Sequence, residues 1–125
     1  MVAATTSGVV DLTERVFALV DAGDYETLRG LMTEEAATAL TADVVLDTWA
    51  RVVADTGNLI ACRDTGVELP DGTTVGATET ALGSVVGHTV LECEAGTWVG
   101  RVAVDPDHRV VGLLVVPREH GPLPF

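Results

Sequence analysis

The sequence predicts an α+β fold in which helices come first and strands follow. Apolar residues recur at helical spacing in the first half of the 125-residue chain, up to Gly57. After Gly57 the pattern changes to short runs rich in valine and threonine, separated by turn residues. The last run, 97–117, is typical of two long strands joined by a tight turn. We therefore expect three N-terminal helices packed on a curved, mostly antiparallel sheet of about five strands.

The first helix is expected to end at Ala22, because Gly23 follows it and glycine commonly terminates helices. Its apolar residues repeat at positions i, i+4, i+7 and i+8, which places them on one side of the helix. This side comprises Val9, Leu12, Val16, Phe17, Leu19 and Val20.

Short polar residues mark the starts of the next helices. Asp24 is expected to cap a second helix, 25–31, and Thr33 a further turn or two. Thr41 is expected to cap a third helix, 42–56, which stops at the glycine that follows. The core-facing side of that helix comprises Val45, Trp49, Val52 and Val53.

Five strands are expected after the helices. The first covers 58–64, and a turn at 69–72 precedes a polar, threonine-rich second strand at 73–81, which suits a sheet edge. The third covers 85–94, and the segment 97–117 supplies the last two.

Two turns set the expected register of the closing strands. A turn at 94–97 pairs Cys93 with Trp98, and the next turn pairs Val104 with Val110. Since side chains alternate along a strand, one face should meet the helices and the other should point away from them. The expected inner face carries Thr89, Leu91, Cys93, Trp98, Gly100, Val102, Val104, Val110, Gly112, Leu114 and Val116. The expected outer face carries His88, Val90, Glu92, Glu94, Val99, Arg101, Ala103, Val111, Leu113 and Val115.

The inner face suggests a place for a ligand. Gly100 and Gly112 lie diagonally on it, and glycine within a strand either bends the sheet or leaves room above it. Both interpretations stay open at the level of sequence. The candidate ligand-binding residues are Trp49, Thr89, Cys93, Trp98, Gly100 and Gly112.

The outer face holds more apolar side chains than a water-facing surface should, so we expect it to be covered. The simplest cover is a second copy of the chain in a twofold homodimer, and the alternative is the chain's own C-terminal tail. We expect one domain, 1–117, followed by a tail, 118–125. The candidate interface residues are Val99, Arg101, Val111, Leu113 and Val115.

Few residues suggest acid or base chemistry. Asp64 would face inward on the first strand if its neighbours do, which makes it the best candidate for a general base. Tyr25 and Asp47, on the second and third helices, are weaker candidates. No metal site is expected, because the three histidines, His88, His108 and His120, show no paired spacing. No cofactor is expected either, since the chain has no glycine-rich nucleotide-binding motif.

The charge balance restricts the partners. The chain carries 19 acidic residues against 7 basic ones, a formal net charge of −12, and every basic residue is an arginine. No basic patch is visible, which argues against nucleic-acid binding. The N-terminus lacks the pattern of a secretory signal, and no apolar run is long enough to cross a membrane, so we expect a cytoplasmic protein.

Three segments together resemble a bacterial domain of unknown function in the nuclear transport factor 2-like superfamily, a cystatin-like fold. They are FALVDAGDYETLRGLM, LTADVVLDTWARVVADTG and LECEAGTWVGRVAVDPDHRVVGLLVVP. The resemblance implies a cone, in which three helices lean on a strongly curved sheet and enclose a cavity. In some relatives this domain precedes an α/β-hydrolase domain. The glycine usual in the last turn is replaced here by His108.

The superfamily includes isomerases, polyketide cyclases and epoxide hydrolases as well as non-catalytic modules, so the fold does not decide the function. The apolar inner face favours a non-catalytic module that binds a small apolar ligand and dimerises. One alternative is an acid/base enzyme of the isomerase, cyclase or epoxide hydrolase type. Another is a structural module whose cone is filled by its own tryptophans.

Overall fold

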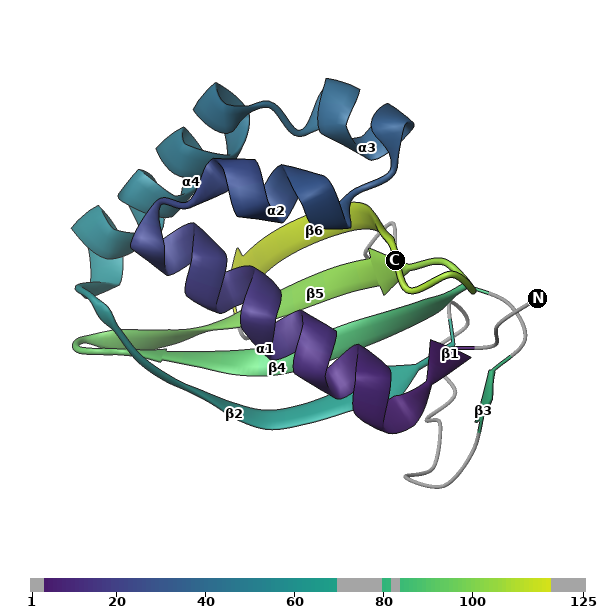
Figure 1. Cartoon of the computed structure of the whole chain (residues 1–125). Helices are drawn as coiled ribbons and strands as arrows, with labels where there is room; N and C mark the ends of the chain where they lie inside the picture. The colour runs from purple at the N-terminus through teal and green to yellow at the C-terminus, as the bar shows by residue number, and fades with distance from the viewer. Residues whose placement is uncertain (1–3, 70–79, 82–83, 118–125) are drawn as a thin grey trace.

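The computed structural model describes residues 4–69, 80–81 and 84–117. Within these residues the chain is α+β, with helices packed on one face of a four-stranded antiparallel sheet of order β2-β4-β5-β6 (Figure 1). The helices are α1 (Thr6–Ala22), α2 (Tyr25–Leu31), α3 (Glu34–Ala39) and α4 (Ala42–Thr56). The sheet contains β2 (Leu59–Glu68), β4 (Val85–Cys93), β5 (Gly96–Val104) and β6 (Val110–Pro117), while β1 (Ala4–Thr5) pairs with β3 (Thr80–Ala81).

The helix boundaries agree with the capping signals. The side chains of Asp24, Thr33 and Thr41 each accept a hydrogen bond from the backbone of the helix that follows. Helix α1 ends at a glycine in the left-handed conformation, Gly23, and α4 ends at Gly57, which also has a positive φ. The turn or two expected after Thr33 is a separate helix, α3, so the described chain has four helices rather than three.

The first strand of the sheet is longer than expected. Strand β2 continues to Glu68. Its pairing with β4 is interrupted by irregularities at 59–61 and 63–66, and it resumes in a shifted register after each of them. Most of the expected strand at 73–81 lies outside the described residues, as does the tail 118–125.

The hairpin between β4 and β5 has a different register from the expected one but the same faces. Cys93 pairs with Gly96, and Leu91 pairs with Trp98, so each partner is displaced by two positions. Side chains alternate with a period of two, and a displacement of two therefore leaves every residue on its expected face.

A bulge changes the faces of β6, and here the expectation was wrong. Val104 pairs with Val110 as expected, but Ala103 then pairs with Gly112, which leaves Val111 as the extra residue. Beyond the bulge every side chain of β6 lies on the face opposite to the expected one. Leu113 and Val115 are inner residues opposite Val102 and Gly100, whereas Gly112, Leu114 and Val116 are outer residues.

Helix α1 crosses the inner face diagonally and at close range (Figure 1). A methyl group added to Gly87 would overlap the hydroxyl of Thr13, and one added to Gly100 would overlap the ring of Phe17. Thr13 and Phe17 are both fully buried. The space above Gly100 is thus filled by the protein's own aromatic ring, and the glycines allow the helix to approach the sheet closely.

Candidate functional site

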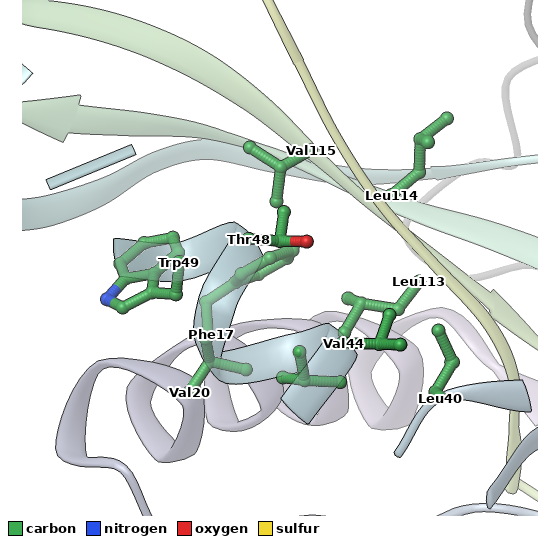
Figure 2. Close-up of a pocket in the computed structure, with 10 residues that line it drawn as sticks. Phe17, Val20, Leu40, Val44, Thr48, Trp49, Leu113, Leu114 and Val115 are labelled. Atoms are coloured by element: carbon green, nitrogen blue, oxygen red, sulfur yellow. The ribbon is translucent and has the colours of Figure 1, made fainter. Parts of the chain in front are cut away.

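An apolar cavity of about 180 Å³ lies between the helices and the last strand. Helix α1 contributes Phe17 and Val20, and β6 contributes three consecutive residues, Leu113, Leu114 and Val115. Figure 2 shows Leu113 and Val115 on one side of β6 and Leu114 on the other. The remaining lining residues are Leu40, Val44, Val45, Thr48 and Trp49.

Helix α4 forms the side of the cavity that is open to solvent. Val44 is 48% exposed, and Thr48, one turn further along the helix, is exposed as well. The hydroxyl of Thr48 is one of two polar groups that the lining residues carry in their side chains. The cavity therefore offers apolar contact almost throughout, and a ligand that carried several polar groups would find few partners there.

Trp49 supplies the other polar group, but it uses that group elsewhere. Its indole nitrogen donates a hydrogen bond to Oδ1 of Asp21 on α1, at 3.3 Å. In Figure 2 this nitrogen points away from Leu113 and Leu40, so the ring presents carbon atoms to the cavity. This hydrogen bond links α4 to α1 and holds one edge of the Trp49 ring at α1, which restricts the orientation of the ring.

Among the six expected ligand-binding residues, Trp49 lines the cavity and the others do not. Trp98 donates its indole N–H to the hydroxyl of Thr56 at 2.8 Å, at the far end of α4. Cys93 is buried in the core, and Gly112 lies on the outer face. The lining residues from β6 were not predicted from the sequence, because the bulge at Val111 decides which side chains of this strand face the helices.

The three candidate acids and bases lie outside the cavity. The hydroxyl of Tyr25 donates a 2.6 Å hydrogen bond to the backbone oxygen of Leu40, so it serves to hold the end of α3. Asp47 is exposed on α4. Asp64 is also exposed rather than inward, because it sits in the irregular part of β2 with a φ of 51°.

A polar cluster that sequence reasoning did not identify lies on the other side of α1, against β2 and β4. The hydroxyl of Thr65 donates to Oε2 of Glu14 at 2.9 Å and also lies 2.8 Å from the hydroxyl of Thr89. The hydroxyl of Thr89 is 3.2 Å from the backbone oxygen of Arg63. Burial raises the pKa of the neighbouring Cys62 thiol, and a hydrogen bond with Thr89 opposes that rise. None of these residues lines the cavity, so the cluster is a separate feature.

The outer face of the sheet combines apolar and charged rows. Val90, Val99 and Val116 pair in sequence across β4, β5 and β6, and form one row. The adjacent row contains His88, Arg101 and Leu114. Two ion pairs cross this face, Arg63 with Glu92 at 2.7 Å and Arg101 with Glu68. Of the expected interface residues, Val99 and Arg101 lie on this face, Val111 is the bulged residue, and Leu113 and Val115 belong to the inner face.

The described part of the chain shows neither a metal site nor a membrane-spanning helix. No three histidine, cysteine, aspartate or glutamate side chains come together there as metal ligands would. None of the helices described combines the length and apolar character that a membrane span requires. Comparisons with protein-family models, with curated proteins and with solved structures find no match to the chain.

Proposed function

We propose that the protein is a non-catalytic binding module for a small apolar molecule, and that the cavity between α4, α1 and β6 is its binding site. The observation that carries this proposal is an apolar cavity of about 180 Å³ beside the fixed ring of Trp49. An apolar cavity of about 150 Å³ accepts a molecule the size of benzene. Pockets for drug-sized ligands have volumes of about 300–1,000 Å³. The preferred ligand therefore has one ring, or an aliphatic chain of similar volume.

Closing the mouth of the cavity should abolish binding. Val44 lines the cavity and is 48% exposed, so a tryptophan at this position has room to fold over the opening. We expect fluorobenzene to bind the unmodified protein with a Kd of about 1 mM, and Val44→Trp to weaken this at least about tenfold. The measurement is the ¹⁹F chemical shift of fluorobenzene during titration with protein.

Val111→Trp is the matched control for this variant. Val111 is also a surface valine, 40% exposed, but it lies in the bulge and does not line the cavity. Binding should be unchanged in Val111→Trp. Equal affinity in the Val44→Trp variant and the unmodified protein would contradict the proposed site, and so would a complete lack of saturable binding.

The two alternative functions have weaker support. An acid/base enzyme needs a titrating side chain beside its substrate. Among the described residues Glu14 comes nearest to such a role, but its carboxylate is engaged by Thr65 and does not line the cavity. A structural module with a filled cone would leave no cavity beside Trp49, whereas about 180 Å³ remains there.

We also propose that the protein forms a homodimer through the outer face of the sheet. The support is the contiguous apolar patch of Val90, Val99, Val116 and Leu114, all of them half-buried in the isolated chain. The ion pairs that flank this patch supply both signs of charge, which a twofold axis can bring into complementary positions.

A charge in the centre of this patch should separate the subunits. Val99 lies between Val90 and Val116, so Val99→Lys places an ammonium group where the partner's apolar side chains would pack. We expect the unmodified protein to sediment as a dimer at micromolar concentration and Val99→Lys to sediment as a monomer with unchanged circular dichroism. Val44→Lys, on the helical side of the molecule, should remain dimeric. A monomeric unmodified protein would refute the dimer without affecting the cavity.

Membership of the nuclear transport factor 2-like superfamily is part of the same proposal. Its support is the order of helices before an antiparallel sheet, together with a cavity between helices and sheet. A structure of the full chain with a flat sheet and no cavity between helices and sheet would contradict it.

A further inference from the structure

A second hollow, with a volume of about 320 Å³, lies where α2, α3 and the start of β6 meet. Its lining is polar, in contrast to that of the apolar cavity, and the two share no residues. Two of the chain's seven basic residues, Arg29 and Arg109, line this one hollow. The other polar side chains around it belong to Thr33, Glu34 and Thr38.

The floor of the hollow is held by bonds between distant parts of the chain. Met32, between α2 and α3, forms a parallel bridge with Val110. The backbone N–H of Thr33 donates to the oxygen of Val110 at 3.0 Å. The guanidinium of Arg109 donates to the backbone oxygen of Met32 at 2.7 Å. Arg109 is thus positioned before any ligand arrives, which reduces the entropy lost on binding.

The charges around the hollow are not neutralised within the described residues. The two ion pairs among the described residues involve Arg63 and Arg101, which lie away from the hollow. Arg29 and Arg109 form no ion pair within the described residues, although the chain has 19 acidic residues. Glu34 lines the same hollow but lies beyond ion-pair distance of both arginines. Within the described residues, the guanidinium of Arg29 has no acceptor, and that of Arg109 has one, the backbone oxygen of Met32. The remaining N–H groups can form hydrogen bonds with carboxylate or phosphate oxygens.

The hydroxyl of Thr33 adds a donor. Its oxygen accepts a bond from the backbone N–H of Ala36 at 3.2 Å, which leaves its proton for another acceptor. The hydroxyl of Thr38 donates to the backbone oxygen of Glu34 at 3.0 Å, so it has only lone pairs to offer. The hollow therefore has two cationic donors and one neutral donor near a single carboxylate.

We propose that this hollow binds a small molecule through one oxyanionic group, a carboxylate or a phosphate, held between Arg29 and Arg109. Thr33 donates a further hydrogen bond to the same group. Glu34 disfavours ligands with several negative charges and favours those with a hydrogen-bond donor beside the anionic group. The site is independent of the apolar cavity, so either proposal can fail without the other.

The test is an amide chemical-shift titration of the full-length ¹⁵N-labelled protein at constant ionic strength. Inorganic phosphate and acetate are added in separate series, which distinguishes the two oxyanions. We expect saturable shifts at the amides of Thr33, Ala37 and Thr38 with at least one of these probes. Arg29→Gln should weaken binding about fivefold to tenfold, because it removes one charged donor.

Arg51→Gln is the control, since Arg51 is an exposed arginine of α4 that does not line the hollow. It should leave the affinity unchanged. Within the described residues the side chain of Arg29 makes no hydrogen bond or ion pair, so its substitution should not disturb folding, and thermal unfolding checks this. Shifts that fail to saturate with both probes, or an equal loss of affinity in Arg29→Gln and Arg51→Gln, would overturn the proposal.

Discussion

Replacing Gly100 with alanine should reduce the free energy of unfolding by about 1–3 kcal/mol, the usual cost of overpacking a core. The added methyl group would overlap the ring of Phe17, which is fully buried and cannot swing into solvent. The helix would have to move away from the sheet, or the ring would have to leave its preferred rotamer. Urea denaturation followed by circular dichroism measures the change. An unchanged or increased stability would show that the helix does not approach the sheet as closely as described.

Gly30→Ala is the control, and its effect should have the opposite sign. Gly30 lies in α2, and a methyl group added there has no atom within 4 Å. Alanine is the better helix former, so we expect a gain of about 0.5–1 kcal/mol. Phe17→Leu in the Gly100→Ala background tests the cause: because the shorter side chain relieves the overlap, the double variant should lose less stability than the sum of the two single variants.

Local signals in the sequence were sufficient to predict where the helices after α1 begin, although α3 was expected only as a further turn or two. Asp24, Thr33 and Thr41 cap their helices as expected, because an N-cap is decided by residues that are neighbours in the chain. His108, which replaces the glycine usual in the last turn, has a φ of 60°, in the left-handed region that glycine adopts most easily. The side chain of Asp105 stabilises that turn by accepting from the backbone N–H of Arg109 at 2.9 Å.

The faces of β6 could not be predicted in the same way. The strand reads VVGLLVV, so apolar residues occupy both alternating sets of positions and the pattern does not indicate which set faces the helices. The bulge at Val111 selects the set that contains Leu113 and Val115. The expected outer face loses two of its apolar residues by this change, and the cavity gains them.

The residues of the candidate site were hard to predict for the same reason, because strand irregularities decide which side chains face inward. Trp49 was predicted to be a ligand contact from its place on α4, and it does line the cavity. Glu14 was missed because it lies beside the apolar stripe of α1, and its partner Thr65 turns inward only at the irregularity in β2. Such irregularities carry no reliable signal in one sequence, yet in this fold they decide which side chains meet.

Shortening Phe17 to alanine should have the largest effect on stability and should also change the ligand that the protein accepts. The ring is 0% exposed, fills the space above Gly100 and lines the cavity. Its removal should cost about 3–5 kcal/mol, because apolar contacts are lost and the enlarged cavity does not collapse completely. The space vacated by the ring adjoins the existing cavity, so a two-ring molecule such as naphthalene should bind the variant and not the unmodified protein.

Leu91→Ala separates the change of ligand from the loss of stability. Leu91 is also 0% exposed, but it does not line the cavity, and its truncation should cost about 2–5 kcal/mol. If naphthalene raises the melting temperature of Phe17→Ala and not that of Leu91→Ala, the added volume lies in the ligand site. Equal responses of both variants would mean that naphthalene binds any loosened core. Since Phe17→Ala removes a large part of the 5–15 kcal/mol that stabilises a typical domain, Phe17→Leu should be measured beside it, and an intermediate affinity is expected.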